Sequence, residues 1–484
     1  MGRLLCEGKS VADSGPYSLT AVETVDLLKR KQVSPLELID AAEARIAAVD
    51  GAVNAMVVRT FDRARQRARS LTLPDAQTPG WLGGLPFAVK DLNDVEGVRT
   101  TFGSPIYKEN ISQRSCLFVQ HMEAMGGLVI GKSNTPEFGA GAQTFNEVFG
   151  ITRNPWDTRM TCAGSSGGSA VALATGQAWL ATGSDLGGSL RTPASFCGVV
   201  GFRPSPGRVP YGPALLPLNT YPVNGPMGRC VADVALMLDA SARHHPLDPI
   251  SYDAPAVSYA QAVANPVKPA KVAWGGGFNG ACPLDPEIED ICRQATLRFA
   301  EIGTVVEDTA PDVSGAREAF QVFRGHYMAA SHGGLLQSQR DLLKPEVIWN
   351  IEYGLSLSGE DVRRATLLQG QLYARFAAFM AGVDILAVPT APVPPFPVEQ
   401  RYVEAINGQK MPSYIDWVLI TSIITMTGLP SVSVPAGFTK GGLPVGLQLV
   451  GRPRGEAALL AAAKLFEDMT GLHKKLPIDP VVRH

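Results

Sequence analysis

The sequence has little net charge of either sign. It contains 43 lysines and arginines against 45 aspartates and glutamates, which gives a formal net charge of −2 over 484 residues. Nucleic acids and anionic membranes attract proteins that carry a basic excess, and this chain has none. We therefore expect a small neutral molecule as its partner, and neither a nucleic acid nor a membrane.

The sequence also lacks any clustering of cysteine with histidine. Its seven cysteines are odd in number, widely spaced and without a CxxC pair. The adjacent His244 and His245 have no third metal-binding residue near them. These absences argue against a disulfide framework and against a zinc site. They favour reduced thiols in a cytoplasmic protein that holds no metal and no cofactor.

No segment has the pattern of a signal peptide or of a membrane span. Residues 1–15 lack an apolar core of the length that secretion requires. The window from Trp417 to Thr439 runs for 23 residues without a charge, but Gly428, Pro430 and Pro435 interrupt it. This window predicts a buried helix, a turn and a strand.

Strands and helices are expected to alternate along much of the chain. Apolar runs at 85–89 and 128–130 predict buried strands, with a helix between them at 116–126. Capping-box patterns at Thr20 and Ser34 predict two N-terminal helices. Such alternation predicts an α/β fold, with a parallel or mixed sheet covered by helices on both faces. The length fits two or three domains, or one large α/β domain with insertions.

The feature that stands out is a stretch from Cys162 to Arg191, which holds seven glycines and five serines in thirty residues. Glycine beside serine at both ends suggests backbone held close to a reacting atom. Residues 164–168 match the pattern G-x-S-x-G of α/β-hydrolases, with Ser166 as the nucleophile of a Ser-His-Asp triad. The histidines that follow it in chain order are His326, His332 and His473.

A second hypothesis makes Ser189 the nucleophile. The backbone amides of residues 186–189 then form a turn that can stabilise a developing oxyanion. No histidine lies close in sequence, so a lysine is the candidate base, provided that burial and its neighbours keep it neutral. Lys90 directly follows the apolar strand at 85–89, where such a lysine is expected.

Residues 164–169 (GSSGGS) and 183–194 (GSDLGGSLRTPA) together resemble the signature of the amidase signature family. Supporting matches lie at 84–91 (GLPFAVKD), 131–134, 137–138, 154–156, 225–229, 389–392, 428–430 and 446–448. The resemblance implies one domain over residues 1–484, built on a large mixed, mostly parallel twisted sheet with helices on both faces. Its core is expected at 60–235 and 384–470. An N-terminal helical layer is expected at 1–59, and a peripheral, mainly helical insertion at 246–380.

The family's serine–serine–lysine triad maps onto Ser189 as the nucleophile, Ser165 as the bridging serine in a cis peptide bond, and Lys90 as the base. The 24-residue separation of the two serines is the spacing that the family pattern requires. The expected oxyanion donors are the amides of Leu186, Gly187, Gly188 and Ser189. Ser166, Ser169 and Asp185 are expected to orient the triad. Arg191 is expected to have a structural role, either pairing with a carboxylate or capping carbonyls, in preference to a role in substrate binding.

The reaction implied by the resemblance is hydrolysis of a carbon–nitrogen bond through an acyl-enzyme. The expected substrates are a small apolar or aryl amide and water, with carbamates (urethanes) and esters as further candidates. Residues 135–162 and 316–420 are expected to build the pocket. The candidate substrate-binding residues are Phe138, Gly139, Cys162, Ala163, Gly164, Trp417 and Ile420.

The alternative within the family is the glutaminase component of a tRNA-dependent amidotransferase. That component is expected to carry an aspartate, which grips the glutamine amino group, about ten residues before Gly428, where this chain has Val418. The asparagine and alanine expected just before that glycine are also absent from residues 424–427. These departures favour a stand-alone monomer or homodimer over a component of a larger enzyme.

Overall fold

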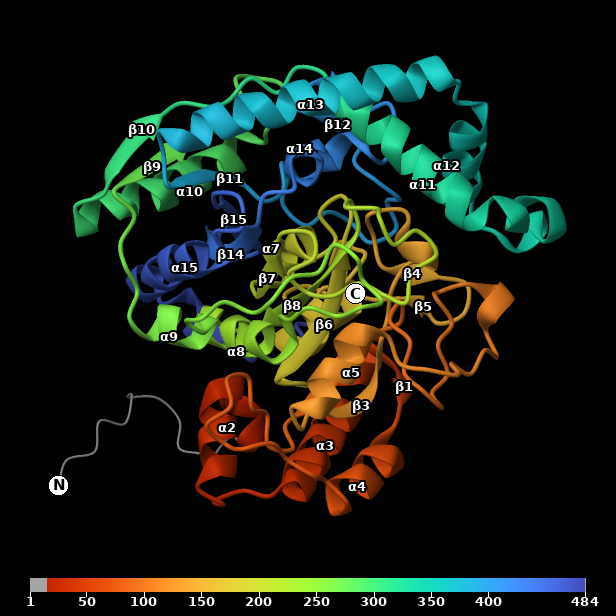
Figure 1. Ribbon diagram of the computed structural model, residues 1–484, viewed down its shortest axis with the longest axis vertical. Coiled ribbons are helices and arrows are strands. Elements are labelled where there is room, and N and C mark those ends of the chain that lie inside the picture. The colour runs from red at the N-terminus through yellow and green to blue at the C-terminus, as the bar shows by residue number, and fades with distance from the viewer. Residues whose placement is uncertain (1–14, 484) are drawn as a thin grey trace.

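The computed structural model describes residues 15–483 and is centred on one 11-stranded sheet (Figure 1). β2 pairs in parallel with β3 and β6, and β9 pairs in parallel with β10 and β11, whereas the other neighbours are antiparallel. The predicted α/β fold with a large mixed sheet is confirmed. In spatial order the strands are β1 (Met56–Arg59), β3 (Leu128–Ser133), β2 (Pro86–Lys90), β6 (Leu180–Asp185), β8 (Val223–Gly228), β7 (Val200–Arg203), β14 (Ser431–Phe438), β15 (Pro444–Val450), β11 (Ile385–Pro389), β9 (Lys271–Trp274) and β10 (Val305–Asp308).

Helices cover both faces of this sheet (Figure 1). The helices that contact the strands of the sheet include α5 (Leu117–Ala124), α6 (Gly167–Ala174), α7 (Arg191–Cys197), α8 (Val231–Ser241), α10 (Pro286–Leu297) and α15 (Glu456–Thr470), and α9 (Tyr259–Ala264) packs on α8 and α15. Apolar strands such as β2, whose residues are all buried, are expected where both faces are covered.

Two groups of helices lie at opposite ends of the molecule (Figure 1). One group is N-terminal and comprises α2 (Ala21–Lys29), α3 (Pro35–Val53) and α4 (Phe61–Arg69). Capping boxes at Thr20 and Ser34 begin α2 and α3, as predicted. The other group comprises α11 (Ala316–Ser338), α12 (Pro345–Ser356) and α13 (Gly359–Ala381).

The segment predicted as a peripheral insertion, 246–380, also contributes to the sheet. Its β9 and β10 extend the sheet beyond β11, because Val272, Ala273 and Trp274 of β9 are apolar and become buried. Likewise β1, from the predicted N-terminal helical layer, pairs with β3. The central sheet therefore contains at least one strand from each segment predicted from the sequence, namely 1–59, the core at 60–235 and 384–470, and 246–380.

The uncharged window 417–439 folds as predicted into a helix, a turn and a strand. α14 (Leu419–Thr427) ends at Gly428, whose φ of 66° suits glycine at a helix C-terminus, and β14 follows. Within residues 15–483, no helix is both long enough and apolar enough to cross a membrane. The same part of the chain contains no group of three potential metal ligands, and its six cysteines are free and buried.

The remaining elements are short. They are β4 (Phe145–Asn146), β5 (Gly150–Ile151), β12 (Ala405–Ile406) and β13 (Gln409–Lys410), with 3-10 turns at Pro16–Ser18, Pro105–Tyr107, Glu137–Gly139, Arg298–Ile302, Arg340–Leu342, Asp416–Val418 and Leu472–Lys475. The prediction that the N-terminus carries no signal peptide concerns residues 1–15. Residues 1–14, including Cys6, lie outside the described part of the chain.

Candidate active site

Lys90 ends β2, the third strand from one edge of the sheet, and has no solvent exposure. Its Nζ donates to three serine hydroxyls: Ser165 Oγ at 2.7 Å, Ser166 Oγ at 2.9 Å and Ser184 Oγ at 3.0 Å. Burial lowers the pKa of Lys90 to about 7, against a smaller opposing effect of Asp185. A lysine with this pKa is partly neutral at pH 7, so its amine can accept a proton from a hydroxyl.

The sheet brings the two halves of the glycine-rich stretch to this lysine. β2 and β6 are parallel neighbours, so Lys90 and Asp185, at their carboxyl ends, meet at the same edge. Ser165 and Ser166 directly precede α6, and the Gly164–Ser165 peptide bond is cis. The position predicted for a cis bond is therefore cis in the structure.

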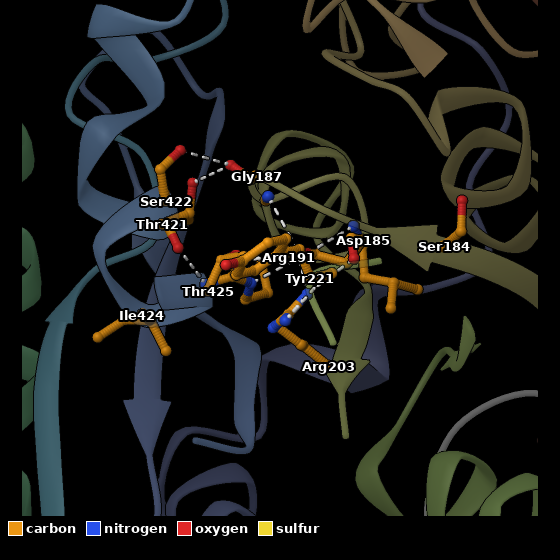
Figure 2. A network of polar contacts seen from close by, with 12 residues as sticks. Ser184, Asp185, Gly187, Arg191, Arg203, Tyr221, Thr421, Ser422, Ile424 and Thr425 are labelled. Carbon is orange, nitrogen blue, oxygen red and sulfur yellow. Dashed lines mark hydrogen bonds and ion pairs between the residues drawn. The ribbon is translucent and has the colours of Figure 1, made fainter. Parts of the chain in front are cut away.

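Ser189 lies in the turn between β6 and α7. Gly188 has a φ of 125°, and a Cβ there would lie 2.3 Å from Thr421 Oγ1, so only glycine fits. The carbonyl of Gly187 accepts hydrogen bonds from Thr421 Oγ1 at 2.7 Å and from Ser422 Oγ at 3.3 Å, as Figure 2 shows. Helix α14 thus fixes the turn from the side opposite β6.

Three of the four predicted oxyanion donors are available in this turn. The amides of Leu186, Gly187 and Ser189 donate no hydrogen bond to any residue in 15–483. The amide of Gly188 donates to Asp185 Oδ1 at 3.0 Å. The set of amides that can hold an oxyanion is therefore Leu186, Gly187 and Ser189, because the Asp185 carboxylate occupies that of Gly188.

Asp185 is the centre of a buried ion network (Figure 2). Its carboxylate accepts from Arg191 at 2.8 and 3.0 Å and from Arg203 at 3.0 Å, and all three side chains have no exposure. Burial by itself would raise the pKa of Asp185, but the two arginines hold this pKa well below its usual range. Arg191 also donates to Thr421 O at 2.9 Å, so it pairs with a carboxylate as predicted and ties α7 to α14.

Ser165 and Ser189 line one cavity of about 300 Å³. No hydrogen bond joins the two hydroxyls, which is common before a substrate closes a site. The wall also includes Leu92, Asn93, Asp94, Cys116, Phe138, Gly139, Ser184, Asp185, Leu186, residues 211–216, Pro222, Asn224, Arg324, Tyr327, Met328, Ser331 and His332.

A recess of about 30 Å³ adjoins this cavity and shares Gly139, Ser189 and Arg324 with it. The rest of its wall is Ala142, Gly164, Gly187, Gly188, Thr192, Phe320, Tyr414, Ile415 and Val418. Ser189 therefore stands where a larger and a smaller space meet, an arrangement that can separate the two sides of a scissile bond.

The predicted substrate-binding residues divide into two groups. Phe138 and Gly139 line the cavity, and Gly139 and Gly164 line the recess. The others, Cys162, Ala163, Trp417 and Ile420, are at most 1% exposed and belong to neither wall. Trp417 packs against Phe196 and Phe396, with ring centroids 6.2 and 5.5 Å away. The structure thus corrects these four assignments, because packing in the core buries them more completely than a pocket would.

Sequence reasoning missed several residues of the site. Ser184 binds Lys90, and its position inside the motif GSDLGGS was the available signal. Arg324 and His332 lie on α11, inside the stretch 316–420 predicted to build the pocket, but nothing local distinguishes them. Residues 211–216 also line the cavity and carry no motif that distinguishes them in sequence.

The Ser-His-Asp alternative finds no histidine in place. Ser166 Oγ contacts Lys90 Nζ and donates to Ser184 O at 3.3 Å, and no histidine within 15–483 hydrogen-bonds to it. His332 instead stacks on Phe138, with ring centroids 4.2 Å apart, and burial lowers its pKa to about 4.

The hydroxyl of Ser169 bonds neither to Lys90 Nζ nor to the hydroxyls of Ser165 and Ser189. It bonds to Ser133 Oγ at 2.7 Å and donates to Thr182 O at 2.8 Å. Thr182 Oγ1 in turn accepts from the backbone amide of Lys90 at 2.9 Å. Ser169 therefore ties α6 to β3 and β6, the two strands that flank β2 and its Lys90, and hydrogen-bonds to no group at the cavity.

Comparison with known proteins agrees with this arrangement. The family model described as Amidase matches residues 37–460. The chain is 38% identical to a glutamyl-tRNA(Gln) amidotransferase subunit of Moorella thermoacetica, over 95% of this chain and 98% of that protein. It is 35% identical to the "Acylamidase" of Rhodococcus erythropolis, over 96% and 98%.

A solved structure shares the fold as well. The crystal structure of a bacterial aryl acylamidase belonging to the amidase signature enzymes superposes with a TM-score of 0.87 at 27% identity, and covers 95% of this chain and 98% of that one. The family match spans most of the chain and includes every residue around Lys90 described above. The chain therefore belongs to the amidase signature family of hydrolases, which act on carbon–nitrogen amide bonds.

Proposed function

We propose that this protein is a stand-alone cytoplasmic amidase that hydrolyses a small apolar or aryl amide through an acyl-enzyme on Ser189. The observation that carries the proposal is Lys90: a fully buried lysine with a pKa of about 7, 2.7 Å from Ser165 Oγ. Ser165 and Ser189 face the same cavity. Such a lysine is suited to general-base catalysis near neutral pH.

In the first half of the reaction, Ser189 Oγ attacks the amide carbonyl carbon. Its proton passes to Ser165 Oγ as the Ser165 proton passes to neutral Lys90. The carbonyl oxygen becomes an oxyanion, which the amides of Leu186, Gly187 and Ser189 can stabilise. The carbon–nitrogen bond then breaks, and the proton held on Lys90 returns through Ser165 to the leaving amine.

In the second half, water replaces the amine. Lys90 and Ser165 take a proton from the water as it attacks the acyl-enzyme, and Ser189 regains its proton when the ester bond breaks. Carbamates and esters present the same carbonyl to Ser189, so they are further candidate substrates.

The substrate preference rests on the wall and on the relatives. Phe138, Leu92 and Met328 give the cavity an apolar side. The relatives named acylamidase and aryl acylamidase support an acyl or aryl amide.

A second candidate is glutaminase activity, and the 38% identity to an amidotransferase component favours it. Val418 argues against this candidate, because it lines the recess where the glutaminase component is expected to carry an aspartate. An apolar side chain offers nothing to the ammonium group of glutamine.

The test is a hydrolysis panel of aliphatic amides, anilides, carbamates, peptide amides and glutamine, run with wild-type enzyme and with Ser189→Ala. We expect anilides or aliphatic amides to be cleaved by the wild type and not by the variant. Labelling with a phosphonofluoridate should modify Ser189. Glutamine as the best substrate would favour the second candidate, and a fully active Ser189→Ala enzyme would refute the acyl-enzyme.

A further inference from the structure

Arg324 is a buried cation that faces the active site without a counter-ion. It lies on α11, is 9% exposed, and lines both the cavity and the recess beside Ser189. Its Nε donates to Asn350 Oδ1 at 3.1 Å and to Tyr414 Oη at 3.2 Å, and its Nη2 donates to Tyr414 Oη at 2.7 Å. These partners are neutral. Within residues 15–483, Nη1 has no hydrogen-bond partner and no carboxylate pairs with the guanidinium.

The carboxylates on the same helix as Arg324, and on the segments that hold Asn350 and Tyr414, are paired with other arginines. Glu318 pairs with Arg364, Glu346 with Arg401 and Asp416 with Arg317. None of them is left to offset the charge of Arg324, and keeping an unpaired charge away from water is costly. A buried arginine in this condition is expected where a ligand supplies the missing anion.

The other buried arginines of the described chain differ from Arg324. Arg191 and Arg203 pair with Asp185, Arg45 pairs with Asp479, and Arg208 lies 3.9 Å from Glu456. Arg229 pairs with no carboxylate of the described residues, but it donates hydrogen bonds to two backbone carbonyls and lines neither the cavity nor the recess. Arg324 combines an unpaired charge, an unused nitrogen and a position at the nucleophile.

The recess has the composition of an anion site. Arg324 is the one charged side chain among the described residues of its wall. The hydroxyl of Thr192, which is 1% exposed, is in the same wall and has no hydrogen-bond partner in the described chain. A space of about 30 Å³ holds only one or two water-sized groups. The larger cavity contains Asp94, whose carboxylate would repel an anion, so the recess is the favoured position.

We propose that Arg324 binds a carboxylate of the substrate in this recess, and that the enzyme therefore selects amides that carry an anionic group close to the scissile bond. Nη1 and the free N–H of Nη2 form the parallel pair of donors that a carboxylate accepts. Thr192 can donate a third hydrogen bond. The inference rests on the proposed function of Ser189, and it narrows the substrate class.

The test uses two matched pairs of anilides that differ only by a carboxylate in place of a methyl group. N-phenylsuccinamate against N-phenylbutanamide places the carboxylate in the acyl part. 4-Acetamidobenzoate against 4-methylacetanilide places it in the amine part. We expect kcat/KM to favour the anionic member of at least one pair by about tenfold or more, and Arg324→Gln to bring that ratio down to about one, mainly through KM, as loss of a charge-assisted pair predicts.

The control is Arg363→Gln, which removes the same charge from a side chain that is 61% exposed on α13. This control should leave the ratio unchanged. If Arg324→Gln does not fold, Arg324→Lys serves instead: it keeps the charge without the two parallel donors, and should lower the ratio by a smaller factor. Preference for the neutral member of both pairs, or an unchanged ratio in the folded Arg324 variant, would overturn the proposal.

A binding measurement separates this proposal from the proposed function. Calorimetric titration of Ser189→Ala with N-phenylsuccinamate and 4-acetamidobenzoate should show that at least one binds more tightly than its neutral partner, and that adding Arg324→Gln removes the difference. Anion-dependent binding without hydrolysis by the wild type would refute the proposed function and leave the role of Arg324 standing. Equal hydrolysis of both members of each pair by the wild type would refute the role of Arg324 and leave the proposed function of Ser189 standing.

Discussion

Two lysines on adjacent strands of the sheet are equally buried and have very different surroundings. Lys90 on β2 and Lys132 on β3 both have no solvent exposure. Lys132 Nζ lies 3.2 Å from Asp91 Oδ1 and donates to Asn93 O and Thr100 Oγ1, each at 2.7 Å. Among the described residues 15–483, only serine hydroxyls lie within hydrogen-bond distance of Lys90 Nζ.

The difference lies in what offsets the charge. Asp91 supplies Lys132 with a counter-ion, so that lysine joins its strand to the loop after β2 as an ion pair. Lys90 has no counter-ion in contact in the part of the chain that the structure describes, and burial lowers its pKa to about 7. The same residue type at the same depth is thus structural in one place and able to exchange protons in the other.

Lys90→Met is the variant that tests the difference between the two lysines most strongly. We expect kcat/KM on the best panel substrate to fall roughly 10⁴-fold, the upper range for loss of a general base. The free energy of unfolding should not fall, because the variant removes a buried amine that has no counter-ion. Steady-state kinetics and urea unfolding measure the two effects. A variant that keeps more than about a hundredth of the activity would remove Lys90 from the mechanism.

Lys132→Met should give the opposite result. It leaves Asp91 buried without its cation, which is expected to lower the free energy of unfolding by about 3 kcal/mol. The activity of the molecules that remain folded should fall far less than in Lys90→Met. Lys132→Met combined with Asp91→Asn serves as the matched control, and should recover part of the lost stability. Equal loss of activity in both single variants would mean that the two lysines do not differ in role.

The pH dependence of catalysis tests the charge state of Lys90 directly. Because the neutral amine is the active form, kcat/KM should rise tenfold per pH unit below about pH 7 and level off above it. The folded pKa lies below the unfolded value, so the unfolded chain binds more protons between pH 7 and 10.5. Stability relative to Lys90→Met should therefore rise with pH across that window. A pH profile that is flat from pH 5 to 8 would contradict this assignment.

Much of the site could be predicted because its signals are local. The apolar run at 85–89 predicts a strand that ends at Lys90, and the two serine–glycine motifs carry Ser165 and Ser189 in their turns. The interrupted apolar window at 417–439 predicts α14, Gly428 and β14 for the same reason. In each case the residues that decide the structure are neighbours in sequence.

The wall of the site could not be predicted because it depends on contacts between distant segments. Trp417 has the size and apolarity of a pocket residue, yet contacts with Phe196 and Phe396, distant in sequence, bury it in the core. Arg324 shows no sign in sequence of lacking a counter-ion. That property appears only when Asn350 and Tyr414 occupy its neighbourhood and the nearby carboxylates pair with other arginines.

Ser184→Ala tests how the surroundings of Lys90 set its charge state, because it removes one of the three hydroxyls that contact Nζ in place of a counter-ion. Ser184 Oγ accepts from Nζ at 3.0 Å and is half-buried at the cavity. A hydroxyl acceptor stabilises the ammonium form, so its loss should shift the midpoint of the pH–kcat/KM profile to lower pH. The amine also loses one of the groups that hold it toward Ser165, for which we expect kcat to fall about tenfold, as loss of one hydrogen bond to a charged group predicts.

Ser169→Ala is the matched control, since Ser169 bonds to Ser133 and Thr182 and does not contact Nζ, so it should leave the midpoint in place. If the midpoint moved to higher pH in Ser184→Ala, the hydroxyls around Lys90 would be stabilising the neutral amine, and its difference from Lys132 would need another cause than the absence of a counter-ion.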